Sequence, residues 1–539
     1  MFRFTQLWGL PFLAVSFSVG AQLLANPSIE ALGLSDLAQA PAAAKQKAVV
    51  ELEAPKVLEK RLKKAYAEAK ESTVSVYLGG SASGVVISKK GLVMTAGHVL
   101  MNAKPDQLAT IKFDDGREFK AKVLGYDLMI DFGLMQIQDM PEGGLPYCKS
   151  ANTFPATGSP CFVLAHPSGR LKGRPAQLRF GRIKNVSTYQ DLPYIAMSDC
   201  DIQPGDSGGP LFDLDGQLIG VASSAAGQKM FNRFIAIDQL RANLKQLKTP
   251  GSKQGDFDKG PGGIGEFAHK FGNDDYPKLQ KELTRRIKGG HQETDRFVKA
   301  KISPEGELKI TQQELIDLMM IDSVSIVKDR PVSYGLDDPE LIKQLPELKT
   351  SEITFPIFVG GNQVGFGVRI SKDALLVKSS LIPEGHEKVL IGGKDGTRTE
   401  SQLGKRIPDW DLAVVKIAPE TPGSTLDLNQ INENPVAGDL LIAIDQFGHK
   451  VLGNATDTIR PVTKERSKGP IGEKIEVSKH RSPYPNVIRH AVPLYAADTI
   501  LPVYNLNGRL VGLHIARFSR TMGLLIPAAE LKKIIATLP

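Results

Sequence analysis

Residues 198–221 read SDCDIQPGDSGGPLFDLDGQLIGV, and we expect this stretch to decide the fold. Its centre, GDSGGP, sets Ser207 among glycines. Glycine adopts backbone conformations that other residues avoid, so the chain can turn sharply around the serine. Such a turn directs the backbone N–H groups of Gly205 and Ser207 towards one point, where they can bind a negatively charged oxygen. The stretch therefore predicts a hydroxyl group beside a pair of anion-binding donors.

The chain on both sides of this stretch predicts β-structure. From Glu71 onward it consists of short β-branched runs, such as TVSVYLGG at 73–80 and AKVLGY at 121–126, separated by Gly, Asp and Lys turns. The pattern persists to FIAIDQL at 234–240. Many short strands with frequent turn residues are typical of an all-β sandwich or barrel. We therefore expect a β domain over residues 71–247.

Two further polar residues in this domain complete a set that is suited to acyl transfer. His98 ends the apolar run LVMTAGH at 92–98, and Asp131 lies among apolar residues in IDFGL at 130–134. Acyl transfer needs a nucleophilic hydroxyl, an adjacent base that takes its proton, and a carboxylate that holds the base in the correct tautomer. Ser207 would supply the first group, His98 the second and Asp131 the third.

At these residues the chain resembles the trypsin-like serine proteases, and more narrowly the HtrA/Deg branch of exported bacterial proteases. The resemblance covers about residues 72–245, and FIAIDQL is similar to the closing strand of that branch. It implies a double β-barrel with the active site in the cleft between the barrels, protein or peptide substrates, and no metal or organic cofactor. The residues that match the family's active site are the triad His98, Asp131 and Ser207 and the oxyanion-hole residues Gly205 and Ser207.

The sequence departs from the family pattern at two points. Asp206 occupies a position where the HtrA branch usually has asparagine, and where the digestive branch has an aspartate that receives a freed N-terminus. No activation-cleavage sequence precedes the domain, so we expect constitutive assembly with Asp206 hydrogen-bonded locally. The HtrA branch typically carries a C-terminal PDZ domain, and we expect none here.

The resemblance leaves two alternatives for the primary specificity. Asp201 occupies the position whose aspartate in trypsin itself binds Arg or Lys side chains. The neighbouring Ile202 matches a position that lines a pocket for small aliphatic side chains in the HtrA branch. Because the surrounding stretch resembles the HtrA branch, we favour substrates with Val or Ala at the cleavage site.

Three sequence blocks recur in the same order towards the C-terminus. The segment at 357–381, IFVGGNQVGFGVRISKDALLVKSSL, matches the earlier VYLGGSASGVVISKKGLVMTAGHV. The segment at 409–417, DWDLAVVKI, matches the earlier IDFGLMQI. The segment at 499–514, TILPVYNLNGRLVGLH, matches the earlier SGGPLFDLDGQLIGVA. An ordered recurrence of this kind indicates two copies of one domain.

The second copy lacks the groups on which the chemistry depends. Leu381 aligns with the histidine and Thr499 with the serine, whereas Asp411 keeps the aspartate and Pro502 keeps the proline that follows the glycine pair. Without an imidazole there is no general base. We therefore expect residues 351–539 to be a degenerate copy, a pseudoprotease.

Three further segments flank or join these two domains. Residues 1–25 combine a basic start, an apolar run and small residues at the end, a pattern typical of a signal peptide; an uncleaved membrane anchor is the alternative. Residues 26–70 predict a helical leader interrupted at Pro55. Residues 248–350 predict a basic linker with helices. The expected fold is mainly β, with two trypsin-like double β-barrel domains in tandem joined by a partly helical linker.

Composition and charge limit the class of partner. With 41% hydrophobic and 23% charged residues the chain is apolar enough to bury ordinary cores, and its net charge of +8 favours only mild attraction to anionic surfaces. No base-reading motif is present, so we expect no nucleic-acid partner, and the histidines show no metal-ligand spacing. We expect an exported protein, periplasmic or secreted, with no transmembrane domain beyond the signal segment. A homo-oligomer is compatible with the sequence.

The three cysteines, Cys148, Cys161 and Cys200, are too few for a disulfide framework. A bridge between Cys148 and Cys161 and small buried thiols are both compatible with the sequence.

A binding or scaffold protein in which both copies are silent is the rival from another functional class. The complete set of Ser207, His98 and Asp131 argues against that rival.

Overall fold

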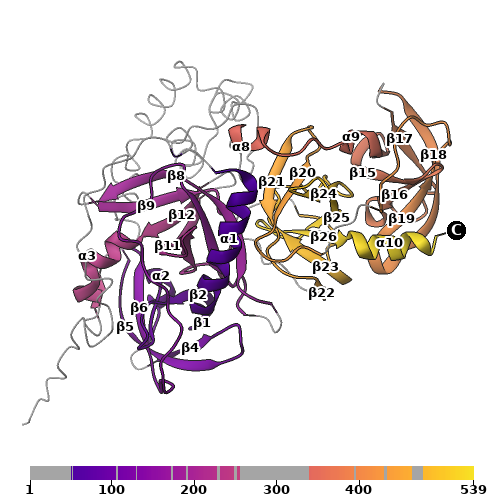
Figure 1. The fold of residues 1–539 in the computed structure, drawn as a ribbon. Coiled ribbons are helices and arrows are strands. Elements are labelled where there is room, and N and C mark those ends of the chain that lie inside the picture. The colour runs from indigo at the N-terminus through magenta and orange to yellow at the C-terminus, as the bar shows by residue number, and fades with distance from the viewer. Residues whose placement is uncertain are drawn as a thin grey trace, which may run out of the picture.

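The structure is a computed structural model that describes residue 50 and residues 53–104, 107–128, 130–170, 174–189, 192–226, 231–247, 252–254, 339–393, 396–429, 434–463 and 477–538. Within these residues the fold is mainly β, and two double β-units follow one another along the chain (Figure 1). The expected mainly β fold with two β-barrel-type domains in tandem is confirmed, except that the second unit of the second copy is an open sheet. The expected signal peptide and the helical patterns of the linker lie outside the described residues.

The first barrel of the first copy forms from short strands whose side chains alternate between the interior and the surface. In β4, for example, Ala109 and Ile111 are buried while their neighbours are not, as the two-residue period of a strand requires. The antiparallel order is β5-β4-β1-β2-β3-β6, and pairing of β5 with β6 closes the barrel. The strands are β1 (Thr73–Tyr77), β2 (Ser81–Val86), β3 (Leu92–Ala96), β4 (Leu108–Lys112), β5 (Glu118–Asp127) and β6 (Phe132–Ile137).

The second barrel of the first copy closes in the order β10-β11-β12-β9-β8-β7. Its interior is filled by apolar side chains such as Val163, Ile183 and Phe234. Helix α3 (Ile237–Leu247) follows the barrel, and the short β13 (Ser252–Gln254) returns to pair in parallel with β5. The strands are β7 (Pro160–Ala165), β8 (Gln177–Tyr189), β9 (Leu192–Ser198), β10 (Pro210–Asp213), β11 (Leu218–Ala226) and β12 (Phe231–Ala236).

The second copy repeats this plan with one closed barrel and one open sheet. The barrel has the order β14-β15-β16-β19-β18-β17, and the sheet has the order β21-β20-β24-β25-β26-β23-β22. The barrel strands are β14 (Thr354–Val359), β15 (Asn362–Ser371), β16 (Ala374–Lys378), β17 (Lys388–Gly392), β18 (Arg398–Ile407) and β19 (Leu412–Lys416). The sheet strands are β20 (Leu440–Ile444), β21 (Lys450–Asn454), β22 (Arg460–Val462), β23 (Tyr484–His490), β24 (Pro502–Asn505), β25 (Leu510–Arg517) and β26 (Gly523–Pro527).

Short helices flank these strands. None of the helices in the described part of the chain is both long and apolar enough to cross a membrane. The remaining helices are α1 (Pro55–Ala69), η2 (Lys70–Ser72), α2 (Gly97–Leu100), α8 (Pro339–Lys343), α9 (Thr350–Ile353), η5 (Ser379–Leu381), η6 (Pro408–Trp410) and α10 (Ala528–Ala536).

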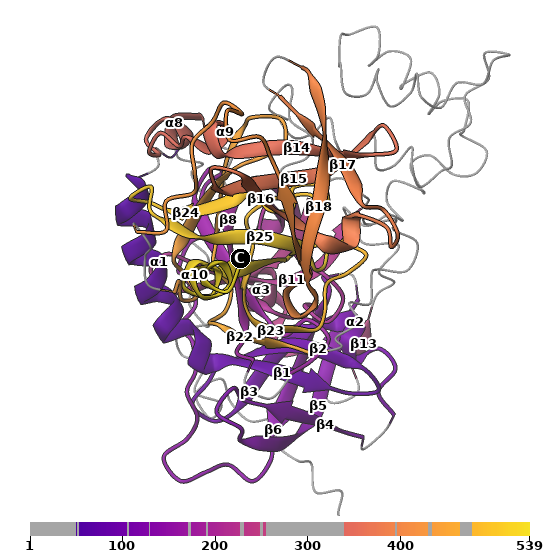
Figure 2. The same cartoon turned by 90° about the vertical axis from the view of Figure 1, so that its right-hand side faces the viewer.

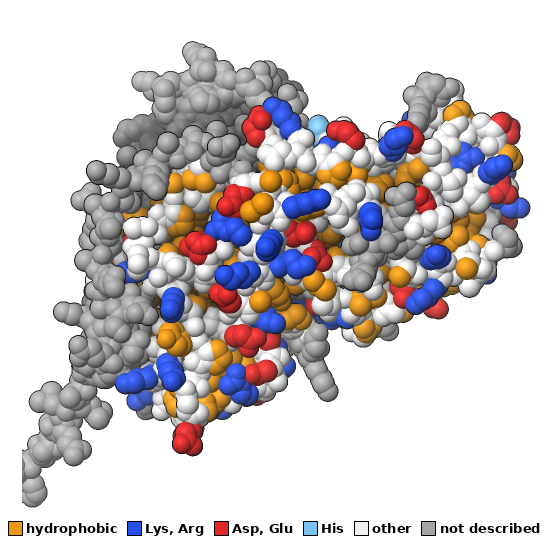
Figure 3. All heavy atoms as spheres, viewed as in Figure 1, with side chains coloured by type: hydrophobic (Ala, Val, Ile, Leu, Met, Phe, Trp, Pro, Cys, Tyr) orange, Lys and Arg blue, Asp and Glu red, His pale blue; other side chains and the backbone are white. Residues whose placement is uncertain are grey.

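Helix α1 lies between the two copies. It begins at Pro55, whose fixed φ suits the first helical position. Leu58, Leu62, Ala65 and Ala69 fall on one helical face and are buried in a cluster that also contains residues of the second copy, among them those of β20. The exposed face of the helix is charged, and Figure 3 shows Lys, Arg, Asp and Glu side chains intermixed over this part of the molecule.

Polar contacts join the copies on either side of this helix. Glu59 accepts a hydrogen bond from the backbone N–H of Leu440 at 2.7 Å, and Lys63 pairs with Asp439. Between β8 and β21, the buried Asn454 side chain accepts from Phe180 N and donates to the oxygen of Leu178, each at 3.0 Å. The second copy therefore packs directly on the second barrel of the first. In the turned view it lies in front of the first copy (Figure 2).

Candidate active site

Three connecting segments bring His98, Asp131 and Ser207 to the junction of the two barrels of the first copy. His98 lies in α2, immediately after β3, and Asp131 immediately precedes β6. Because β3 pairs with β6, these two residues lie at the same end of the first barrel. Ser207 comes from the loop before β10 of the second barrel. Ser83 of β2 ties the barrels together, because its N–H donates to the oxygen of Ser207 at 2.9 Å.

The three side chains form a continuous hydrogen-bonded line. His98 Nε2 is 2.9 Å from Ser207 Oγ, and His98 Nδ1 is 3.0 Å from Asp131 Oδ1. The Asp131 carboxylate is fully buried, and its Oδ1 also accepts the backbone N–H of His98 at 2.9 Å. Its Oδ2 accepts the hydroxyl of Ser223 at 2.6 Å. The carboxylate is thus held by several donors, and the imidazole is held by the carboxylate.

The environment of His98 changes the basicity of its imidazole. Burial acts to lower the pKa of His98, but the hydrogen bond and the negative charge of Asp131 outweigh burial and raise this pKa above its ordinary value. A raised pKa makes the ring a better proton acceptor when Ser207 loses its proton. The side chain of His98 is about one-third exposed, so the site is open to solvent at the imidazole.

The loop before β10 presents backbone donors beside Ser207. Gly205 has φ 97°, a conformation that favours glycine, and an added Cβ there would collide with the backbone of Ser168. Within the described part of the chain, the N–H groups of Gly205 and Ser207 donate to no other backbone group. Both N–H groups are therefore available to an oxyanion.

A buried ion pair holds this loop. The sequence did not predict this pair. Asp206 Oδ2 accepts the backbone N–H of Gln203 at 2.8 Å, which is the local bond that we expected. The same oxygen lies 2.7 Å from Nη1 of Arg179 in β8, and both side chains are almost completely buried. Burial raises the pKa of Asp206, and the positive charge of Arg179 opposes that rise. Arg179 thus supplies the positive charge that pairs with Asp206 in this loop.

The two candidate specificity residues are both buried. Ile202 is 3% exposed and packs in the apolar interior of the second barrel. Asp201 is 6% exposed, and its Oδ1 accepts a hydrogen bond from Asn232 Nδ2 at 3.1 Å. Burial raises the pKa of Asp201 to about 7, although Arg520 of the second copy, the amide of Asn232 and further arginines act to lower it. The carboxyl at this position is therefore held inside the protein by its neighbours.

In the second copy, the structure corrects the sequence alignment at the position of the histidine. Strand β16 ends at Lys378 and pairs with β19 in the register in which β3 pairs with β6. This register places Ser380 where the first copy has His98, whereas the alignment placed Leu381 there. The N–H of Ser380 donates to Asp411 Oδ1 at 2.7 Å, as that of His98 does to its aspartate. The alignment was wrong by one residue because no residue after the strand is shared between the two blocks.

The remaining aspartate of the second copy has different partners. Asp411 Oδ2 accepts the hydroxyl of Ser380 at 2.7 Å and lies 3.2 Å from Nζ of Lys378, which is almost completely buried. Burial lowers the pKa of Lys378 to about 8, although Asp411 acts to raise it. Thr499 is fully buried, and its hydroxyl has no hydrogen-bond partner among the described residues. A lysine and a serine therefore surround the carboxylate where the first copy has an imidazole.

Sequence reasoning missed Ser223, Arg179 and Asn232. Each makes a contact with a residue far away in the chain, such as the pairing of Ser223 with Asp131 across 92 residues. The serine-rich run VASSAA marks no single residue, so the sequence alone carried no signal for Ser223. A buried arginine in a strand could have been noticed for Arg179, since charged residues in strand interiors are usually paired.

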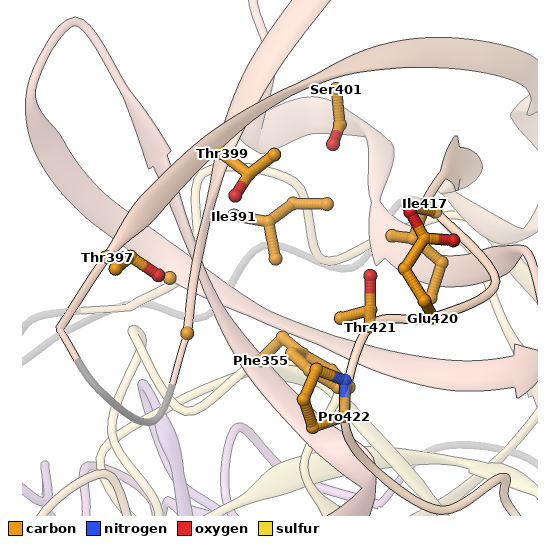
Figure 4. A pocket seen from close by; sticks show the side chains of 12 residues that line it. Phe355, Ile391, Thr397, Thr399, Ser401, Ile417, Glu420, Thr421 and Pro422 are labelled. Carbon is orange, nitrogen blue, oxygen red and sulfur yellow. The ribbon is translucent and has the colours of Figure 1, made fainter.

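The cysteines add no chemistry to this site, and the cavity described next lies in the second copy. All three cysteines are free and buried, and Cys161 lies 3.7 Å from Cys200, sulfur to sulfur. No cluster of potential metal ligands occurs among the described residues. A cavity of about 440 Å³ lies in the barrel of the second copy, where Thr397, Thr399 and Glu420 face apolar side chains (Figure 4).

Comparison with known proteins identifies relatives for the first copy. Residues 82–221 match the family profile described as trypsin-like peptidase domain. The chain is 33% identical over 181 residues to the "Probable periplasmic serine endoprotease DegP-like" of Halomonas elongata, covering 32% of this chain and 35% of that protein. It is 31% identical over 169 residues to "Serine protease HTRA2, mitochondrial" of Drosophila virilis, covering 29% and 39%. The chain spans about a third of the length of the curated relatives that it matches.

Among solved structures, the chain is similar to the crystal structure of Deg5. That match has a TM-score of 0.32 and 23% identity, and it covers 38% of this chain and all of the other.

Proposed function

We propose that this protein is an exported serine endopeptidase whose first copy hydrolyses peptide bonds. The observation that carries the proposal is the hydrogen-bonded line from Asp131 through His98 to Ser207. A serine hydroxyl is a weak nucleophile by itself, and an adjacent imidazole held by a carboxylate is the arrangement that activates it.

The geometry supports a two-step acyl transfer. His98 Nε2 takes the proton of Ser207 Oγ as the hydroxyl attacks the peptide carbonyl. The negative charge that develops on the carbonyl oxygen is stabilised by the N–H groups of Gly205 and Ser207. His98 then gives its proton to the leaving amine. Water finally hydrolyses the acyl-enzyme with the same imidazole as base, and Asp131 stabilises the imidazolium in both steps.

Export is supported by two independent observations. Residues 1–25 have the pattern of a signal peptide. Relatives of the first copy carry the names of periplasmic serine endoproteases. Secretion of the full chain fused to a reporter that is active only outside the cytoplasm would test this part of the proposal; a reporter that stays silent would contradict it.

We assign no catalysis to the second copy. Asp411 there is hydrogen-bonded to Ser380 and ion-paired with Lys378, and Thr499 is buried. Without an imidazole beside it, a threonine hydroxyl has no base to accept its proton. The second copy is therefore a pseudoprotease in this proposal.

Covalent labelling of the full chain tests the proposal directly. A fluorophosphonate reacts with a serine hydroxyl that an adjacent base has activated. We expect stoichiometric labelling at Ser207, none in Ser207→Ala, and unchanged labelling in Thr499→Ala, which removes the corresponding hydroxyl of the second copy. A wild-type protein that is folded and remains unlabelled would overturn the proposal in favour of a silent scaffold.

A further inference from the structure

Ser83 of β2 binds the loop before β10 through two of its polar groups. Its backbone N–H donates to the oxygen of Ser207 at 2.9 Å, and its hydroxyl donates to the oxygen of Gly205 at 2.8 Å. Gly205 and Ser207 are the two residues whose N–H groups are available to an oxyanion. One residue of the first barrel therefore binds the carbonyl of each residue that supplies an oxyanion donor.

The Ser83 side chain is itself fixed by contacts from both barrels. It is fully buried, and its Oγ accepts the backbone N–H of His166, the residue that follows β7 of the second barrel, at 2.9 Å. The carbonyl oxygen of Ser83 accepts the hydroxyl of Thr95, in β3 of the first barrel, at 2.8 Å. A serine hydroxyl has one proton to donate. Because Oγ accepts from His166, that proton is left for Gly205.

Gly205 needs such a bond because its backbone can rotate. Its φ of 97° lies in the region that favours glycine, where no side chain restricts it. Rotation about the backbone bonds of Gly205 would turn its N–H away from the point towards which the Ser207 N–H is directed. The carbonyl before its Cα, that of Pro204, accepts the N–H of Ser168 only at 3.3 Å. The shorter bond from Ser83 to the carbonyl after its Cα opposes the same rotation.

The bond from Ser83 also sets the position of the loop relative to the base. The peptide group that follows Gly205 makes a second hydrogen bond, from Asp206 N to the oxygen of Gln203 at 2.9 Å, but both of these residues belong to the loop. Ser83 belongs to the barrel that carries His98. Its hydroxyl therefore anchors the oxyanion-binding residues to the barrel from which the proton acceptor comes.

The second copy lacks this anchor although it retains the loop. The register of β15 on β16 and of β16 on β19 places Phe366 at the position of Ser83 and Val377 at the position of Thr95. Neither side chain can donate a hydrogen bond. The aspartate of the corresponding loop nevertheless accepts the N–H of the residue three positions before it in both copies. A hydroxyl that was needed only to fold the loop would be expected in both copies.

We propose that Ser83 is a positioning residue for the oxyanion hole: its hydroxyl holds the carbonyl of Gly205 and thereby keeps the N–H of Gly205 directed at the oxyanion. This inference rests on the proposed peptidase function and deepens it. Ser83 acts through Gly205, so its contribution arises when negative charge develops on the substrate carbonyl oxygen. It should therefore stabilise the transition state more than the bound substrate.

The test measures kcat and KM of the full chain on a fluorogenic peptide with Val at the cleavage site. Removal of a complete oxyanion donor costs about 100- to 1,000-fold in kcat. Ser83→Ala only loosens such a donor, so kcat should fall by about ten- to a hundredfold while KM stays within about twofold. If Ser83→Ala does not fold, Ser83→Cys keeps a side chain of similar size with a weak donor and should show the same loss of kcat.

Ser88→Ala is the matched control. Ser88 is also a fully buried serine of the first barrel, and its hydroxyl accepts the backbone N–H of Leu92 at 3.2 Å. It lies at the end of β3 opposite to His98. Ser88→Ala should therefore lower the denaturant midpoint, as the loss of a buried hydrogen bond does, and leave kcat within about twofold of wild type.

Fluorophosphonate labelling of wild type separates failure of this inference from failure of the proposed function. If wild type is labelled at Ser207, a folded Ser83→Ala protein with the kcat of wild type would overturn this inference alone. So would a loss of activity that appears only in KM, or an equal loss of kcat in Ser88→Ala. A folded wild type that is not labelled would overturn the peptidase proposal and this inference with it.

Discussion

The loop that carries Ser207 and the loop that carries Thr499 have the same backbone hydrogen bonds and different side chains. Gly208 N donates to the oxygen of Ala222 at 2.7 Å, and Ile500 N donates to that of His514 at 2.6 Å. In each loop an aspartate that precedes the hydroxyl residue accepts an N–H from the residue three positions before it. The fold of this loop therefore does not depend on a nucleophile.

Left-handed backbone conformations also recur at corresponding positions of the two copies. Asp131 has φ 45° and Asp411 has φ 52°, although Asp411 has no imidazole to hold. At the next such position Gly208 has φ 80°, and the second copy has the β-branched Ile500 with φ 68°. A left-handed β-branched residue costs about 1–3 kcal/mol and persists only where its surroundings hold it. The geometry of the loop thus belongs to the barrel architecture, and the chemistry is added by a few side chains.

The largest difference between the copies should appear when their hydroxyls are removed. Ser207→Ala is expected to lower kcat by about a million-fold, the scale seen when a catalytic serine is lost from a comparable triad. Thr499→Ala should leave kcat within about twofold, because that hydroxyl is buried without a partner among the described residues. Steady-state turnover of a peptide substrate measures both. Activity that survives Ser207→Ala would show that the copies are assigned wrongly.

Replacing Asp131 should change the pH dependence of kcat/KM, whereas replacing Asp411 should not. Catalysis needs neutral His98, so kcat/KM should fall as the pH drops through a histidine pKa that lies above the ordinary value of 6.5. Asp131→Asn should lower kcat by about ten-thousand-fold and shift this limb to lower pH, because burial then acts on the imidazole without the opposing charge.

Asp411→Asn is the matched variant of the second copy, and its pH profile should superimpose on that of wild type. A profile that shifts with Asp411 and not with Asp131 would contradict the assignment of the active copy.

Breaking the buried ion pair between Arg179 and Asp206 should lower the free energy of unfolding more than breaking an exposed ion pair. Arg179→Met leaves Asp206 without its cation in the interior and should lower the free energy of unfolding by about 3–5 kcal/mol, with a loss of kcat. Arg61→Met breaks the exposed pair with Asp215 and should cost less than about 1 kcal/mol. Denaturant unfolding and peptide turnover measure the two effects. Equal costs would show that the pair does not support the loop.

The smallest expected effect concerns the left-handed glycine. Gly208→Ala adds a Cβ that would meet Thr95 Oγ1 and the oxygen of Ser83, in a conformation that costs a non-glycine residue about 1–3 kcal/mol. We expect a lower melting temperature and reduced turnover. A Gly208→Ala variant as stable as wild type would show that the first loop tolerates side chains as the second does.

Sequence reasoning predicted the mainly β fold and singled out His98, Asp131 and Ser207, which the structure brings together, because both depend on local signals. Short runs with turn residues predict strands, and the glycines around Ser207 predict a sharp turn. The residues that it missed act across the fold: Arg179 meets Asp206, and Ser223 meets Asp131, only after the strands that carry them have packed. The shift from Leu381 to Ser380 has the same cause, because the register of β16 on β19 decides it and neither block records that register.

Helix α1 has a consequence for the order in which the molecule can be completed. Its Glu59 binds the backbone of Leu440, a residue that lies 381 positions further along the chain. Because ribosomes build proteins from the amino end, this helix emerges long before the strand against which it packs. Until synthesis reaches that strand, one side of the helix has no partner, and the bonds that lock the two halves together are among the last to form.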